Sequence, residues 1–220
     1  MVPAFTSYPV PAREVRHEIT VVNSRFIATL APVFDVEAAR AFIQRIRAEF
    51  SDATHNVPAY LVGYGDSVIA HSSDDGEPSG TAGRPALTVL RGSGLGDVAV
   101  VVTRYFGGTK LGTGGLVRAY TQAVQEVLAR TPRARKVLAH TLLLAVPYSL
   151  YERVRDLTPV HGGAVLDSDF GVDVTLTIRL PVDRLDTYQS ALQELSGGRL
   201  QAEVMETEVA IVPLGAQSDD

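Results

Sequence analysis

"VVVTRYFGGTKLGTGGLVRAYTQAV" (residues 100–124) is the stretch that decides the fold of the first half of the chain. Its Val-rich start is a continuous apolar run and predicts a strand buried on both faces. From Leu116 onward, apolar residues recur at helical spacing until Pro132 ends the pattern. A buried strand, a Gly-rich loop and a helix therefore follow one another, which is typical of a sheet covered by helices.

Upstream of this stretch, the sequence predicts the order β, α, β, β and then a short helix. "RHEITVVNSRFIATLAPV" (16–33) alternates apolar and polar residues and fits one long strand or a hairpin around Asn23-Ser24. "DVEAARAFIQRIRAEF" (35–50) has helical spacing, with Asp35 as its N-cap. "AYLVGYGDSVIAHSS" (59–73) fits two strands about a Gly65-Asp66 turn, and "RPALTVLRGSG" (84–94) a short helix.

Beyond residue 137 the pattern changes to strand, helix, hairpin, helix and strand. The two helices are "SLYERVRDLTPVHGG" (149–163) and "VDRLDTYQSALQELSGGR" (182–199), and the hairpin between them is "AVLDSDFGVDVTLTIRLP" (164–181). This βαββαβ order is that of ferredoxin-like domains. We expect the last residues, "LGAQSDD" (214–220), to form a loose tail.

The distribution of charge divides the chain in the same way. Residues 1–136 carry 15 Lys and Arg against 12 Asp and Glu, whereas residues 137–220 carry 5 against 13. The sign changes at the basic, Pro-containing segment "RTPRARK" (130–136), which indicates a domain junction. We therefore expect an α+β protein of two domains: a two-layer α/β sandwich at 1–134 and a ferredoxin-like βαββαβ domain at 135–220.

Composition bounds the class of protein. The 220 residues contain 45% hydrophobic residues, which is enough for sizeable cores, and no cysteine, which excludes disulfides and thiolate metal sites. No segment approaches 18 uninterrupted apolar residues, and the start of the chain lacks a basic region followed by an apolar run. We expect a cytoplasmic protein without membrane contact, bound metal or other cofactor.

The Gly-rich loop is the first candidate site. Free amides at a helix start and the helix dipole attract anions, and glycines let a phosphate approach the backbone. The alternative is that the glycines serve tight turns and close packing. Neither G-x-G-x-x-G nor a Walker pattern is present, which excludes those nucleotide motifs. The candidate phosphate or nucleic-acid ligands are Arg104, Gly107, Gly108, Lys110, Gly112, Gly114, Gly115 and Arg118.

The acidic stretch "SSDDGEPSGTAGRPAL" (72–87) is the second candidate. Its three acids could hold Mg²⁺, take part in acid–base chemistry, pair with Arg84 and Arg104, or cap the following helix. We expect pairing with the basic loop, because an α/β sheet brings strand ends and their loops to a common edge. The residues to which we assign a supporting role there are His55, Asp74, Asp75, Glu77, Ser79, Arg84, Tyr105 and Tyr120.

A catalytic nucleophile is missing from these patterns. His55 is the one histidine in a polar, catalysis-compatible context, and a structural role is the commoner one. No G-x-S-x-G elbow and no paired-His metal spacing occurs. We therefore assign no catalytic residue.

Several motifs together resemble one family. "SRFIA" (24–28), "ATHNVPAY" (53–60), "DDGEPSGTAGRPAL" (74–87) and the opening stretch are similar to the YigZ/IMPACT family over roughly residues 17–130. The resemblance implies a first domain similar to domain IV of elongation factor G and to the second domain of a small-subunit ribosomal protein. The acidic half is similar to the last domain of that factor. Val57 stands where the family pattern leads us to expect a cysteine, so no catalytic thiol is implied.

The resemblance also implies a role in translation, since the eukaryotic relatives act in translational control through a protein partner. Our leading hypothesis is a non-enzymatic factor that binds RNA, the ribosome or a protein and acts in translation or its regulation. One alternative is an enzyme that acts on a phosphorylated small molecule or nucleotide, with Asp74 or Asp75 holding Mg²⁺. The other is a protein-interaction adaptor that uses a sheet face or the acidic domain.

Overall fold

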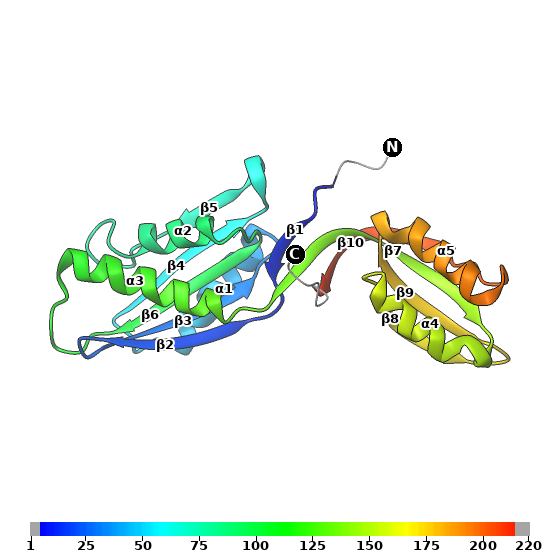
Figure 1. Ribbon diagram of the computed structural model, residues 1–220. Coiled ribbons are helices and arrows are strands. Elements are labelled where there is room, and N and C mark those ends of the chain that lie inside the picture. Colours follow the sequence, from blue (N-terminus) through cyan, green and yellow to red (C-terminus); the bar gives the residue numbers. More distant parts are fainter. Residues whose placement is uncertain (1–4, 214–220) are drawn as a thin grey trace. The chain divides into compact units, whose positions relative to one another are not determined.

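The computed structural model describes residues 5–213 and consists of two compact units (Figure 1). One unit spans Tyr8–Arg133, and the other contains the chain from Ala134 onward. The expected tail at 214–220 lies outside the described residues. Each unit combines helices with an antiparallel sheet, which confirms the predicted two-domain α+β class.

The amino-terminal unit is built on a five-stranded antiparallel sheet of order β2-β3-β6-β4-β5. The buried Val-rich run forms its central strand, β6, as the sequence predicts. A short strand, β1 (Tyr8–Pro11), precedes the sheet. The five strands are β2 (Val15–Val21), β3 (Ser24–Pro32), β4 (His55–Val62), β5 (Ile69–Ser72) and β6 (Val98–Tyr105).

The first predicted strand segment is a hairpin. Val22 and Asn23 separate β2 from β3, and both have positive φ, 46° and 66°. Two successive residues of this kind form the two-residue turn whose twist matches antiparallel strands. Between β4 and β5, the expected turn contains a 3₁₀ segment at Gly65–Ser67.

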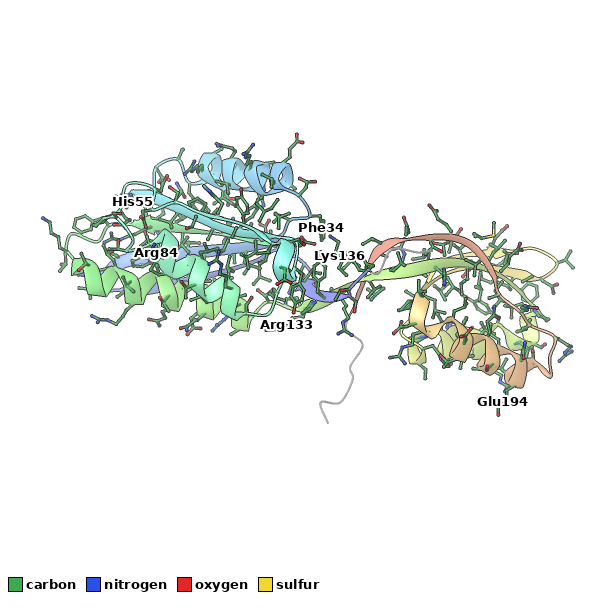
Figure 2. All side chains as sticks on the ribbon, turned by 90° about the horizontal axis from the view of Figure 1, so that it is seen from above. Phe34, His55, Arg84, Arg133, Lys136 and Glu194 are labelled. Atoms are coloured by element: carbon green, nitrogen blue, oxygen red, sulfur yellow. The ribbon has the colours of Figure 1, made fainter. Side chains whose placement is uncertain are left out.

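Helices cover both faces of this sheet. The helices are α1 (Val36–Glu49), α2 (Gly83–Gly92) and α3 (Gly112–Ala129). Figure 2 shows α1 on one side of the strands and α2 with α3 on the other. The two cores reflect this, because β6 gives Val98, Val100 and Val102 to the core under α2 and α3 and Ala99 and Val101 to the core under α1.

The predicted two-layer sandwich therefore needs a correction to three layers. A central strand that is apolar on both faces requires a cover on each face. Helix α1 supplies the second cover, and it begins as predicted: the Asp35 side chain accepts a hydrogen bond from the Ala38 amide at 2.6 Å.

The carboxy-terminal unit has the predicted βαββαβ order. Its strand order β10-β7-β9-β8, antiparallel throughout, is that of a ferredoxin-like sheet. Both helices pack on one face, where Tyr188 and Leu192 of α5 meet Leu150 and Val154 of α4 and the apolar residues of β7 and β9. The elements are β7 (Arg133–Val146), α4 (Tyr148–Val160), β8 (Ala164–Phe170), β9 (Val174–Pro181), a 3₁₀ segment (Val182–Arg184), α5 (Leu185–Ser196) and β10 (Glu203–Pro213). Among the helices in the described residues, none has the length and apolarity needed to cross a bilayer.

Candidate functional site

A buried ion pair joins the acidic stretch to the end of β6. Arg104 Nη1 donates to Glu77 Oε1 at 2.6 Å, and both side chains are almost fully buried, with 6% and 3% of their surface exposed. The Tyr120 hydroxyl of α3 donates to the same oxygen at 2.8 Å. Burial, and secondarily the Glu77 carboxylate, raises the pKa of Tyr120 well above its ordinary value, so this phenol stays a donor.

Arg104 is also tied to the β2–β3 hairpin. Its Nη2 donates to Ser24 Oγ at 3.3 Å, and the same oxygen accepts from the Gly107 amide at 3.2 Å. The guanidinium lies 5.4 Å from the centroid of the Phe26 ring and 5.6 Å from that of Phe106. Its Nε is buried and, within the described structure, has no hydrogen-bond acceptor. Arg104 therefore links three segments while keeping one donor unsatisfied.

His55 lies beside this pair, at the start of β4. Its Nδ1 is 2.7 Å from the carbonyl oxygen of Asp75, an acceptor, so Nδ1 carries the proton in this contact. The Nε2 atom is 3.8 Å from Glu77 Oε2. The acidic stretch thus fixes the orientation of the ring through the backbone of Asp75.

The three acids of the stretch have separate partners. Asp75 accepts from Arg47 Nη2 and from the Asn56 amide, each at 2.6 Å, so it ties α1 and β4 to the loop. Asp74 accepts from the amides of Gly80, Ala82 and Gly83 and so organises the start of α2. Because these oxygens are engaged by backbone amides and by Arg47, the arrangement favours a structural role over Mg²⁺ binding. The described residues contain no cluster of three or more His, Asp or Glu arranged to hold a metal ion.

The hydrogen bonds that Asp74 accepts at the start of α2 stabilise the folded protein, and we expect this stabilisation to be lost in acid. Burial acts to raise the pKa of Asp74, but the amides of Gly80, Gly83 and Ala82 and the charge of Arg84 outweigh it, so the pKa lies below its ordinary 3.8. A group with a lowered folded-state pKa contributes stability above its unfolded-state pKa and loses it as pH falls through the folded-state pKa. In urea unfolding, the stability difference between the wild type and Asp74→Asn will stay constant above about pH 5 and shrink towards about pH 2.

Comparison with Asp74→Asn isolates the contribution of the Asp74 charge to stability, because asparagine keeps one acceptor oxygen and does not titrate. The remaining acids titrate alike in both proteins and cancel in the difference. If the difference in stability between the two proteins is the same at about pH 5 and about pH 2, Asp74 does not have the stabilising role that we assign to it.

A pocket of about 370 Å³ opens beside the ion pair, where β6 ends and α3 begins. The polar groups around it include the side chains of Arg104 and Lys110 and the first residues of α3. Its polar lining is Thr54, His55, Glu77, Arg104, Lys110, Gly112 and Thr113, and its apolar lining is Pro78, Phe106, Leu111 and Leu116.

The start of α3 presents its backbone amides without a side-chain cap. The N-cap residue is Leu111, whose side chain cannot accept a hydrogen bond, and Gly112 and Thr113 follow it at the pocket wall. The first amides of a helix have no partner within the helix, and the helix dipole makes this end positive. This part of the pocket can therefore accept an anion.

The glycines of the loop have different roles. A Cβ at Gly107 would lie 2.0 Å from the carbonyl oxygen of Asn23, so this position must be glycine for the loop to pack on the hairpin. Gly108 and Gly112 have positive φ, 84° and 70°, as tight turns require. The interpretation that these glycines serve tight turns and close packing therefore applies to Gly107, Gly108 and Gly112.

The structure brings together only part of the predicted site. Arg104, Lys110 and Gly112 line the pocket with His55 and Glu77. Arg118 is exposed one turn into α3, with its guanidinium beside Gly114, and the backbone of Gly115 packs on Leu111. The expected pairing of the acidic stretch with Arg104 is present through Glu77.

Other assignments do not converge on the pocket. Arg84 is exposed and acts on Asp74 through its charge, and it forms no ion pair within the described structure. Tyr105 donates to Asp52 at 2.8 Å, and Ser79 is exposed in the loop. Figure 2 shows His55 and Arg84 towards the same end of the amino-terminal unit, and Phe34 towards the other. Val57, at the position of the expected family cysteine, is fully buried in the core under α2 and α3.

Sequence reasoning missed several residues of the site. Phe106, Pro78 and Leu111 supply the apolar wall, and Ser24 and Arg47 hold the loops from other segments. One signal could have identified Phe106. An aromatic residue between the end of a predicted strand and the first glycine of a loop lies outside the hydrophobic core, so its ring is exposed. Ser24 and Arg47 carry no such signal, because they approach the site only through strand pairing and helix packing.

Fold and site together define a two-domain α+β protein with a polar pocket at the start of a helix. The chain belongs to the IMPACT family. The family model described as the Impact N-terminal domain matches residues 22–128, and that described as Domain of unknown function (DUF1949) matches residues 144–199.

Relatives match along both units. The IMPACT family member YigZ of Escherichia coli (strain K12) is 39% identical over 196 residues, covering 89% of this chain and 96% of that protein. The IMPACT family member YvyE of Bacillus subtilis (strain 168) is 36% identical over 183 residues, covering 83% and 84%. A solved structure, described as the crystal structure of a hypothetical protein, has 38% identity and a TM-score of 0.61 and covers 92% of this chain and 98% of that one.

Proposed function

We propose that this protein is a non-enzymatic cytoplasmic factor that binds RNA, as a free strand or on the ribosome, and acts in translation or its regulation. The observation that carries the proposal is the pocket at the start of α3, where Arg104, Lys110 and the open amides of Gly112 and Thr113 meet. These groups match the phosphates of a nucleic-acid backbone. The translational role follows from the resemblance to the YigZ/IMPACT family, whose eukaryotic members act in translational control.

Charge limits where the RNA binds. The sequence pI is about 5.5, so the whole protein does not attract nucleic acid indiscriminately. The excess of positive charge lies in residues 1–136, and within the described structure neither Lys110 nor Arg118 forms an ion pair. Both are exposed near the start of α3, so they are available to phosphates.

Replacing Lys110 or Arg118 with alanine will weaken RNA binding by a similar factor for every RNA sequence. Each lysine or arginine that contacts a phosphate contributes about 0.7 to the slope of log affinity against log salt for a single strand. The slope should therefore fall by about 0.7 in each variant, with a loss of several-fold in affinity at low salt. Mobility-shift or anisotropy titrations over a salt series measure both quantities.

Arg40→Ala is the matched control, because Arg40 is also exposed but lies on α1, which covers the opposite face of the sheet. We expect it to bind RNA as the wild type does. Unchanged affinity and slope in both Lys110→Ala and Arg118→Ala would remove the proposed phosphate site.

A second candidate function, a protein-interaction adaptor, is favoured by the open sheet face of the carboxy-terminal unit. Strand register sets Asp167, Thr177, Leu143 and Glu203 in one row, on the face opposite the helices. Asp169 and Glu206 are exposed on the neighbouring strands, and Glu208 pairs with Arg179 at 3.2 Å. An acidic face of this kind fits a basic protein surface. Affinity capture with and without nuclease distinguishes the candidates, since a directly bound protein survives nuclease and one bridged by RNA does not.

A further inference from the structure

We infer that the pocket at the start of α3 accepts one unpaired nucleotide, with its base on the Phe106 ring and its phosphate at the α3 amides. The inference rests on the proposed function and deepens it, because it names the unit of RNA that is recognised. Three observations lead to it: the two kinds of wall, the exposed aromatic ring and the buried guanidinium of Arg104 at the pocket.

The walls of the pocket differ in chemistry. Phe106, Pro78 and Leu116 present apolar surface, whereas Lys110 and the first residues of α3 present positive charge and amide donors. A phosphate alone would need only the second wall. A nucleotide matches both, because it joins a flat apolar base to a phosphate through a sugar.

Phe106 has the position of a stacking platform. This residue is 47% exposed although it lines the pocket, and the Arg104 guanidinium lies 5.6 Å from its ring centroid. The backbone on both sides is held, since the Phe106 amide donates to Thr54 Oγ1 at 3.1 Å and Gly107 packs on the β2–β3 hairpin. A ring held open to solvent at a cationic site is how proteins stack single-stranded bases.

Arg104 contributes a buried positive charge to the pocket. Only 5% of this residue is exposed, it lines the pocket, and its Nε has no acceptor within the described structure. The Glu77 carboxylate that pairs with it is shared with Tyr120 and approached by His55. A phosphate in the pocket would add negative charge and acceptor oxygens next to a buried cation.

The size of the pocket fits a single nucleotide. Its volume of about 370 Å³ is near the lower end of ligand pockets, which run from roughly 300 to 1,000 Å³. This space suits a single nucleotide. A base within a duplex is stacked on both faces and cannot enter, so single-stranded RNA is preferred over its duplex.

The test uses the full chain and fluorescence anisotropy with a labelled adenosine oligonucleotide, single-stranded or annealed to its complement. Phe106→Ala should weaken binding of the single strand by about tenfold, while Phe106→Tyr, which keeps a ring, should stay within about twofold. Phe34→Ala is the matched control, because Phe34 is 46% exposed and lies towards the other end of the same unit (Figure 2). Circular dichroism checks that each variant is folded.

Competition identifies the recognised unit. Adenosine monophosphate should displace the oligonucleotide from the wild type and compete less well in Phe106→Ala. Tighter binding of the strand than of the monophosphate identifies RNA as the source of the nucleotide, and the reverse identifies the free nucleotide. Equal competition by inorganic phosphate would mean that the base contributes nothing and would overturn the inference.

The failures of the inference and of the proposed function are distinguishable. If Lys110→Ala weakens RNA binding while Phe106→Ala does not, or if single and double strands bind alike, the inference is wrong and the RNA-binding function stands. If the wild type binds neither RNA nor nucleotide, both are wrong.

Discussion

Replacing Glu77 with alanine will destabilise the amino-terminal unit by about 3–5 kcal/mol. The substitution leaves the buried guanidinium of Arg104 without its carboxylate and the Tyr120 hydroxyl without its acceptor. A buried charge that loses its partner retains its full desolvation penalty, which explains why the effect exceeds that of a surface pair. Urea unfolding followed by circular dichroism measures the loss, and hydrogen exchange of β6 peptides assigns it to this unit.

Glu18→Ala is the matched control. Glu18 pairs with Arg25 through two hydrogen bonds of 2.9 Å, but both side chains are about half exposed, so its loss should cost less than about 1 kcal/mol. Converting both buried partners at once, Glu77→Leu with Arg104→Met, should recover much of the stability, because no unpaired charge remains. Equal losses in Glu77→Ala and Glu18→Ala would mean that the buried pair is not what holds these loops.

Gly107→Ala will have a comparable effect for a steric reason. The added Cβ would lie 2.0 Å from the Asn23 carbonyl oxygen and 2.6 Å from the Ser24 amide nitrogen, and both are main-chain atoms that cannot rotate away. The loop or the β2–β3 hairpin must shift, and we expect a loss of about 3 kcal/mol or more. Because Gly107 also donates to Ser24, the shift should weaken RNA binding as well. Urea unfolding and the RNA titration measure the two effects.

Gly92→Ala, at the last position of α2, is the control of opposite sign. A Cβ there meets nothing within 4 Å in the described structure, and its φ is not positive. Alanine should therefore stabilise the unit by about 0.4–1 kcal/mol by restricting the unfolded chain. A Gly107→Ala protein as stable as the wild type would show that the approach of loop and hairpin is not rigid.

Local patterns predicted the secondary structure because they depend on neighbours in the sequence. The apolar run of β6, the helical spacing after Leu116 and the Asp35 N-cap each specify their own segment. The same holds for the βαββαβ order, whose helices and hairpin are each bounded by their own turn residues. The predicted number of layers was wrong, because the face of the sheet that α1 covers is set by tertiary packing and not by a local pattern.

The sequence alone also identified the Gly-rich start of α3 and the acidic stretch, since each is a local feature. The tertiary structure decided which acid meets which cation. Glu77 contacts Arg104, whereas Asp74 contacts the amides at the start of α2 and Asp75 contacts Arg47, because the loop conformation directs the three side chains to different segments. The pocket itself, with Phe106 at its wall and Ser24 beneath Arg104, exists only once β3 pairs with β6 and α3 packs on the sheet. Such contacts join residues up to 83 positions apart, and no local pattern encodes them.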